Sequence, residues 1–273
     1  MNADRVFNSR VFLWILVILG ALAVVLPIYW LVLTSMMPSG LRGAFPLPMF
    51  ILALSFESFS FVFDLGLFGY LMNSIIVAVG TALFCTVIGS LAAYSFAKMR
   101  FPFKYLFLMM PLLSRMVPDT GIAVPIIETF NRLGLGDTYT GLILVHSLLA
   151  LPIVIWIMTS LFQEVPNDLL EAGEIDGCTR MQTFYKIALP LVAPGISTSM
   201  IFSFLISWDE LLFSMMLMTT KLTVPAFISQ YISYPQYPNV MAISVFLLIP
   251  AFIFTFVFQR YIRAGIMAGA VKG

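Results

Sequence analysis

Charge is scarce in this 273-residue sequence, where Asp, Glu, Lys and Arg make up 10% of the residues and hydrophobic residues make up 61%. The mean hydropathy is +1.02. A soluble domain of this length needs a polar surface that such a composition does not supply. The formal net charge of +1 also excludes the broad basic surface of a nucleic-acid-binding protein. The sequence therefore predicts a polytopic membrane protein.

Residues that carry chemistry are equally scarce. His146 is the single histidine, HExxH is absent, and no group of His, Cys and carboxylates has metal-ligand spacing. No GxxxxGK[ST] loop is present to cradle the phosphates of ATP. We therefore expect no enzymatic activity, no metal and no cofactor in this chain, two free thiols at Cys85 and Cys178, and a His146 that faces other helices.

Six apolar segments are long enough to cross a bilayer, which takes about 20 helical residues. They cover about residues 11–41, 68–96, 105–127, 139–162, 196–217 and 240–259. We expect the first to be an uncleaved span, because its apolar run continues past the signal-peptidase-like Ala21-Leu22-Ala23. Pro111, Pro118 and Pro125 predict a bent third span, and residues 37–68 suit an extracytoplasmic connection with one short helix.

The basic residues orient these six spans. With a cytoplasmic N-terminus, ten lysines and arginines lie inside and three outside, as the positive-inside rule requires. The inside set is Arg5, Arg10, Lys98, Arg100, Lys104, Arg180, Lys186, Arg260, Arg263 and Lys272, and the outside set is Arg42, Arg132 and Lys221. We expect both termini to be cytoplasmic, in a multi-pass membrane protein.

The longest polar interruption, residues 165–195, lies on the predicted cytoplasmic side. Pro166 as a first helical residue, with Asp168 and Glu171 at capping-box spacing, predicts a short helix that ends near Asp176 at Gly177. A set of acids surrounds the small pair Ala172-Gly173 on this helix: Glu164, Asp168, Glu171, Glu174 and Asp176. The helix is either a docking surface for another protein or an amphipathic segment on the membrane surface.

A second helix is predicted directly after the first. Thr179 and Gln182 repeat the capping spacing, and Leu189-Pro190 is expected to end this helix. One apolar face is predicted from residues at i, i+3, i+4 and i+7, namely Met181, Phe184, Tyr185 and Ala188.

Ionisable residues at predicted membrane depth are Arg115 in the third span and Asp209-Glu210 in the fifth. Each costs about 2.5–3.5 kcal/mol at a helix centre unless it faces protein or water. They either line a substrate pathway or form interior ion partners that hold helices together. Asn73, Ser74 and Trp208 likewise either line a polar cavity or bond neighbouring helices.

Several motifs together resemble one family of transporters. Glu171-Ala172-Gly173, Asp176-Gly177 and Ile187-Ala188-Leu189-Pro190 resemble the EAA loop of ABC importer permeases, with Gly173 in place of the second alanine. Three further stretches resemble the carbohydrate type of these permeases: LGLGDTYTGLIL at 133–144, SWDELLFSMML at 207–217 and QRYIRAGIMAGAVKG at 259–273. The resemblance runs from about Asn73 to the last residue.

The resemblance implies an all-α polytopic protein with six transmembrane helices, the type I importer architecture and a cytoplasmic coupling loop at about 164–195. Residues 1–67 would hold the first helix and an extracytoplasmic loop, 68–262 the transmembrane core, and 263–273 a cytoplasmic tail. The chain would lie in a bacterial or archaeal cell (inner) membrane and form half of the pathway for a sugar or sugar-like solute.

The implied partners are a second homologous permease, a cytoplasmic ATPase dimer that binds ATP and Mg, an extracytoplasmic solute-binding protein and membrane lipid. The connection 219–239 would contact the binding protein. The residues implied in ATPase coupling are Asp168, Glu171, Ala172, Gly173, Asp176, Gly177, Leu189 and Pro190, and those implied in a tail contact are Gly269, Ala270, Val271, Lys272 and Gly273.

Two other classes of protein remain open from the residues alone. An ion-coupled secondary transporter would use Asp209, Glu210 and Arg115 and would work without an ATPase. A purely structural membrane subunit would explain the apolar spans, but it gives no reason for the acidic, capped loop.

Overall fold

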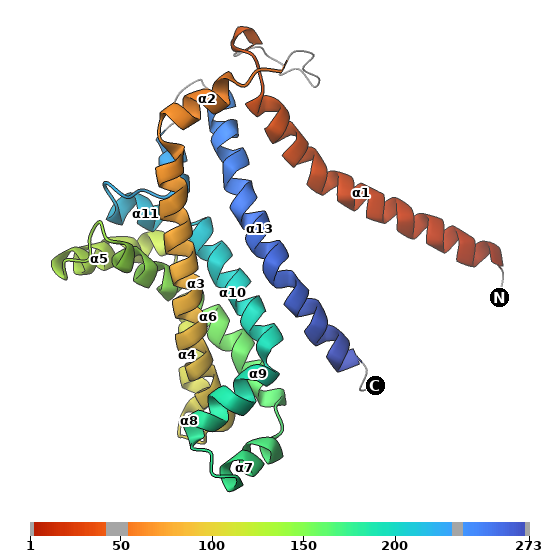
Figure 1. Ribbon diagram of the computed structural model, residues 1–273, viewed down its shortest axis with the longest axis vertical. Coiled ribbons are helices and arrows are strands. Elements are labelled where there is room, and N and C mark those ends of the chain that lie inside the picture. The colour runs from red at the N-terminus through yellow and green to blue at the C-terminus, as the bar shows by residue number, and fades with distance from the viewer. Residues whose placement is uncertain (1–2, 42–53, 231–236, 271–273) are drawn as a thin grey trace. The chain divides into compact units, whose positions relative to one another are not determined.

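Figure 1 shows the computed structural model of the chain, which describes residues 3–41, 54–230 and 237–270. All regular secondary structure in these ranges is helical. The chain divides into two compact units. Met1–Phe68 and Ile228–Leu248 form the first, and Gly69–Phe227 and Ile249–Gly273 form the second.

The first unit contains α1 (Ala3–Ser35), the 3₁₀ turn η1 (Ser39–Leu41), α2 (Glu57–Asp64) and the start of α13 (Tyr237–Ala270). The most apolar stretch of α1 contains no buried residue, so this helix presents its side chains to lipid or to another protein. Helix α2 is the short helix expected in the first connection, and α13 contains the predicted sixth span.

Aromatic contacts tie α2 to α13 inside this unit. The rings of Phe59 and Phe63 stand edge-on to Phe246, with centroids 5.8 and 5.1 Å away. Edge-to-face pairs at this distance add about 0.5–1.5 kcal/mol beyond their buried area.

The second unit holds most of α3 and all the helices from α4 to α11. Their bounds are α3 (Leu67–Lys98), α4 (Lys104–Ser114), α5 (Asp119–Arg132), α6 (Tyr139–Glu164), α7 (Asn167–Ile175), α8 (Arg180–Thr183), the π-helix η2 (Phe184–Ala188), α9 (Leu189–Leu191), α10 (Ala193–Trp208) and α11 (Leu212–Leu217). Helix α12 (Val224–Ser229) begins in this unit.

Helix α6 is the central element of the second unit, and both of its hydrophobic cores are built on it. Leu142, Val145 and Leu149 join α3, α5 and α11 in one core. Val154, Met158 and Phe162 join α3 and the segment from α7 to Val192 in the other. Helix α6 is apolar on most sides, and neighbouring helices bury most of its apolar stretch.

Small residues let these helices approach closely. The space that a Cβ would need at Gly89 of α3 is filled by Val154 of α6, whose Cγ1 would lie 2.5 Å away. Ile143 fills the same space at Gly80, and Leu161 does so at Gly195 of α10. Packing of this kind replaces the hydrophobic driving force, which is missing between helices in lipid.

The predicted third span is not one bent helix. It separates into α4 and α5, with an interruption at Arg115–Pro118. Proline disfavours helical backbone in the residue before it, and Pro118 itself is extended with ψ 133°. Pro111 and Pro125 lie inside helices, so only one of the three prolines marks the interruption.

The predicted fifth span is also interrupted. Helix α10 ends at Trp208, and α11 begins only at Leu212. In the described residues four helices are long and apolar enough to cross a membrane, or five if Arg180–Leu191 and Ala193–Trp208, which meet at 81°, form one broken span. The all-α polytopic architecture is confirmed, whereas the count of six spans stays a prediction.

We predict that Gly89→Ile will lower the free energy of unfolding by about 1–3 kcal/mol, because the new side chain meets Val154 where α3 and α6 are closest. The measurement is the thermal unfolding midpoint of the purified protein in detergent. Gly69→Ile is the matched control on the same helix, since nothing lies within 4 Å of a Cβ there. Equal midpoints for the two variants would contradict the packing argument.

Candidate functional site

The polar interruption folds into a compact elbow, which we define as residues 165–192 and which comprises α7, α8, η2 and α9. Gly177 ends α7 with φ +88°, a value that glycine adopts without strain. The predicted capping box at Thr179 is confirmed. Its hydroxyl accepts from the N–H of Gln182 at 3.3 Å, and the Gln182 side chain accepts from the Thr179 N–H at 2.8 Å.

The prediction for the start of the elbow's first helix is wrong. Pro166 is extended and precedes the first helix, which begins at Asn167 without a side-chain cap, so Asp168 and Glu171 form no capping box. The second helical segment ends at Leu191, so the stop predicted at Leu189-Pro190 is right to within one residue. The chain passes through the π-helical turn η2 and through α9, and it bends by 81° at Val192. The wider π turn comes immediately before Pro190, which has no N–H to donate to a regular helix.

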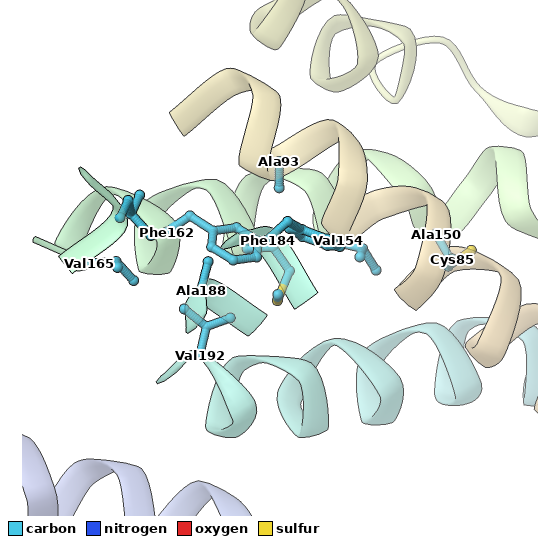
Figure 2. Packing of buried hydrophobic residues seen from close by; sticks show 11 residues of the cluster. Cys85, Ala93, Ala150, Val154, Phe162, Val165, Phe184, Ala188 and Val192 are labelled. Carbon is cyan, nitrogen blue, oxygen red and sulfur yellow. The ribbon is translucent and has the colours of Figure 1, made fainter. Parts of the chain in front are cut away.

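Aromatic rings fix the elbow to the membrane helices. Phe184 of η2 lies 5.1 Å from the ring of Tyr94 on α3 and 6.1 Å from that of Phe162 on α6. Figure 2 shows Phe184, Ala188 and Val192 gathered beside Phe162. The predicted apolar face is therefore half right, because Met181 and Tyr185 are 58% and 47% exposed.

Gly173, the residue that departs from the EAA pattern, is buried where α7 meets η2. The Cδ1 atom of Ile187 occupies the space that a Cβ at position 173 would take. The glycine thus makes room for a side chain of the elbow's second half.

The outer face of α7 is exposed and acidic. Leu170 and Gly173 are buried against the elbow, while Asp168, Glu171 and Ala172 face outward. Glu174, Asp176 and Gly177 are exposed as well.

Two apolar side chains were missed from the sequence. Leu169 and Ile175 are 46% and 86% exposed beside the acids of α7. Their signal is their position outside the stripe of the buried pair, since Leu169 comes one residue before Leu170 and Ile175 comes two residues after Gly173, which turns both away from the core.

Lys98 connects α3 to the start of α7, and no sequence pattern predicted it. Its ammonium donates to the carbonyl of Val165 and, at 2.9 Å, to Oδ1 of Asn167. A recess of about 590 Å³ opens beside it between the end of α3 and α7. Its charged lining residues are Lys98, Arg100, Glu171, Glu174 and Arg180.

Glu210 lies in the interruption between α10 and α11 and is bound from several sides. Its carboxylate accepts from the N–H groups of Phe213 at 2.9 Å and Ser214 at 3.2 Å, which covers the N-terminus of α11. Its Oε2 lies 3.0 Å from Nε2 of His146, a fully buried residue of α6.

His146 continues this polar chain across the unit. Its Nδ1 lies 2.7 Å from Oγ of Ser207 on α10, and Ser207 donates to Thr81 of α3 at 3.3 Å. The expectation that His146 faces other helices is confirmed. The chain of polar groups holds α3, α6, α10 and the α11 turn together.

The other predicted pathway residues are placed as follows. Arg115 ends α4 and pairs with Asp119 at 3.0 Å, with both side chains partly exposed, so it is not an ion partner of Asp209 or Glu210. Asp209 is exposed at the end of α10. Trp208 is 2% exposed and stacks on Phe204 at 5.3 Å.

Asn73 and Ser74 bond neighbouring backbone. Asn73 donates to the Leu222 carbonyl at 3.0 Å, and Ser74 accepts from the N–H of Val224 at 2.8 Å. Of the predicted tail contacts, Gly269 and Ala270 form the end of α13, and Val271, Lys272 and Gly273 lie outside the described residues.

A family model described as binding-protein-dependent transport system inner membrane component matches residues 85–267, which include the elbow and the Glu210 cluster. The chain belongs to this family. It is a permease subunit of an ABC importer, and no comparison favours the ion-coupled secondary transporter.

Full-length relatives agree with the family match. The permease is 34% identical to the trehalose transport system permease protein SugB of Mycobacterium tuberculosis, over 91% of this chain and 92% of that protein. It is 35% identical to the trehalose/maltose transport system permease protein MalG of Thermococcus litoralis, over 75% of each. A chain of a bacterial ABC transporter involved in the import of the polysaccharide alginate has the same fold, with a TM-score of 0.78, 21% identity and coverage of 96% and 98%.

We predict that Gly173→Ala alone will loosen the elbow. Alanine strengthens α7 by up to about 1 kcal/mol, but displacing Ile187 costs about 1–3 kcal/mol. Hydrogen exchange of the α7 amides should therefore speed up in Gly173→Ala and return to the wild-type rate or slower in Gly173→Ala/Ile187→Val, which lacks the Cδ1 atom. Wild-type exchange in the single variant would show that Ile187 moves aside without cost.

We predict different outcomes for the two adjacent acids. Glu210→Ala leaves His146 and the first amides of α11 without the carboxylate, which lowers the free energy of unfolding by about 3 kcal/mol or more. The exposed Asp209→Ala changes it by about 0.5 kcal/mol or less. Thermal unfolding in detergent measures both, and a large loss in Asp209→Ala would reverse the assignment.

Proposed function

We propose that this permease forms half of the translocation pathway for a sugar or sugar-like solute and couples to a separate ATPase through the elbow. One observation supports the coupling surface above all. The inner face of α7 is packed into the core of the second unit, whereas its outer face presents Glu171, Asp168 and the apolar Ile175. A rigidly held helix with a mixed acidic and apolar outer face suits a protein partner better than a lipid surface.

The likeness to named relatives supports the solute class. Relatives are described as transporting trehalose, trehalose and maltose, or arabinooligosaccharides. These solutes share a neutral, polyhydroxylated surface. Asp209, exposed at the interrupted end of α10, is the best placed of the predicted pathway residues to accept hydrogen bonds from such hydroxyls.

The proposed orientation places the elbow and both termini in the cytoplasm. Lys98, Arg100 and Arg180 at the elbow then obey the positive-inside rule. The proposed assembly contains a second permease, an ATPase dimer that binds ATP and Mg, and an extracytoplasmic solute-binding protein. One solved relative of the fold is described as bound to a periplasmic protein that carries an alginate pentasaccharide.

Movement of α7 is transmitted to the membrane helices by contacts that already exist. Lys98 joins the end of α3 to Val165 and Asn167, so these groups shift together. Phe184 holds the second half of the elbow against Phe162 of α6. Closure of an ATPase dimer on α7 would thus pull on α3 and α6 at once, and binding energy on the cytoplasmic face becomes helix motion.

We predict that Glu171→Lys will uncouple ATP hydrolysis from uptake, because the partner surface must accept an acidic helix. Each 1.4 kcal/mol of lost docking energy weakens the contact about tenfold. In proteoliposomes of the purified complex, sugar uptake per ATP hydrolysed should fall about tenfold or more, with a smaller loss in Glu171→Gln.

The matched control is Glu128→Lys on α5, an exposed acid that pairs with Arg132, four residues further on, at 3.5 Å. It should transport at the wild-type ratio. Full coupling in Glu171→Lys, at normal expression and assembly, would overturn the proposed role of the elbow. Uptake by this chain without ATP or partners would favour the secondary transporter instead.

A further inference from the structure

Asp137 stands between α5 and α6, at the end of the second unit opposite to the elbow. Its backbone has φ +53°, a left-handed conformation that Asp, Asn and Gly tolerate better than other residues. Its N–H donates to the carbonyl of Leu217 at 2.9 Å, so the chain here is already paired with the end of α11.

The Asp137 carboxylate binds the segment that follows α11. Oδ1 accepts from three consecutive N–H groups, those of Thr219 at 2.9 Å, Thr220 at 3.0 Å and Lys221 at 3.4 Å. Oδ2 accepts from the Thr220 hydroxyl at 2.6 Å. Charge-assisted bonds of this kind are about twice as strong as neutral ones.

Other elements hold the same segment further along. Asn73 of α3 donates to the Leu222 carbonyl, and its Oδ1 accepts from the Tyr139 hydroxyl of α6 at 2.7 Å. The Thr223 hydroxyl donates to Ser214 of α11 at 2.7 Å. We call Asp137, Asn73, Ser74 and their bonds to residues 219–224 the latch.

The ionised state of Asp137 is well protected. The Thr220 hydroxyl holds the pKa of this carboxyl far below its ordinary range, the slight burial opposes this, and the three backbone N–H groups reinforce it. The folded pKa is depressed, so the stabilisation from the charge is fully present above the unfolded pKa of about 4 and is lost only as the pH falls through the folded pKa. The facing groups are Lys221, whose ammonium donates to the Asp137 carbonyl, and Tyr139. The latch therefore stays closed in moderately acidic surroundings.

The position of the latch decides what it can serve. Helix α6 has 26 residues, so its ends lie about 39 Å apart. The latch is at its first turn and the elbow follows its last, which places them on opposite sides of a membrane. Figure 1 shows α11 on the side of the unit away from α7 and α8. With the elbow in the cytoplasm, the latch faces the compartment of the solute-binding protein.

We propose that Asp137 is a positioning residue for the solute-binding protein: it holds Thr219–Val224 in one conformation, so that this segment is already ordered when the binding protein docks. This inference rests on the proposed function. Thr219 and Thr220 are exposed although their backbone is fixed, which leaves their outward side free for a partner. Pre-ordering a loop removes an entropy cost that docking would otherwise have to overcome.

Asp137→Gly removes the carboxylate of the latch and leaves the backbone conformation unchanged. Glycine keeps the left-handed conformation without strain but removes every side-chain bond. Asn73→Ala releases Leu222 from a different element. Glu128→Gln on α5 is the control, an exposed acid near the same end of α6 that is not part of the latch.

The first measurement is hydrogen exchange of the purified complex. We expect the amides of Thr219, Thr220 and Lys221 to exchange at least about tenfold faster in Asp137→Gly, and at the wild-type rate in Glu128→Gln. Unchanged exchange in Asp137→Gly would show that the carboxylate does not order the segment, and it would overturn the inference.

The second measurement is ATP hydrolysis by the reconstituted complex, titrated with the solute-binding protein that co-purifies with it in mild detergent. We expect the half-saturating concentration of binding protein to rise about tenfold in Asp137→Gly and in Asn73→Ala, with the maximal rate within about twofold of wild type. A fall in maximal rate at unchanged half-saturation would mean a structural role only and would overturn the inference.

The two proposals fail in different ways. If no binding protein stimulates the wild-type complex, the proposed function fails. If the wild type is stimulated and both latch variants keep its half-saturation, only the inference about Asp137 fails. Should Asp137→Gly not assemble, Asp137→Asn takes its place in both measurements, because asparagine also tolerates the left-handed backbone and removes the charge.

Discussion

The close packing of α6 against α3 and α10 is the constraint on which the rest of the second unit depends. Lipid is as apolar as leucine, so helices gain little by burying apolar surface against each other and must instead fit closely or share polar bonds. This unit uses both means. Gly80, Gly89 and Gly195 admit side chains of the facing helices, and His146 joins Ser207 to Glu210 in the same interface.

Helices α3 and α6 carry bonded contacts at both ends of the unit. Helix α3 holds the latch through Asn73 and Ser74 and the elbow through Lys98, two positions about 37 Å apart along its axis. Helix α6 begins beside Asp137 and ends at Glu164, where the elbow starts. Each end is held by bonded groups rather than by loose loops. A displacement at one end therefore moves the tightly packed pair of helices as a rigid body and reaches the other end.

Local signals predicted this structure well, and long-range ones escaped prediction. The Thr179 capping box has both partners within three residues, so the sequence was enough. The pattern at Asp168 has the same spacing and failed, because Pro166 sets where the helix starts. The contacts of Glu210 with His146, of Lys98 with Asn167 and of Asp137 with Thr219 join residues that are 64, 69 and 82 positions apart, which spacing along the chain cannot show. The breaks between α4 and α5 and between α10 and α11 were not predicted either. Hydropathy measures polarity and says little about where a helix is continuous.

The adjacent acids Asp209 and Glu210 differ in their surroundings and therefore in what their carboxylates can bind. The Glu210 carboxylate is fully engaged, with two amides of α11 and His146 around it, so removing its charge would leave several groups unsatisfied. Asp209 is one position earlier at the exposed end of α10 and keeps acceptor capacity toward solvent. Because Glu210 already accepts from the first N–H groups of α11, the break between α10 and α11 needs no bound solute to satisfy them. Under the function proposed above, in which Asp209 lines the solute pathway, an interruption that is stable when empty would let the solute bind and leave without the helices refolding each time.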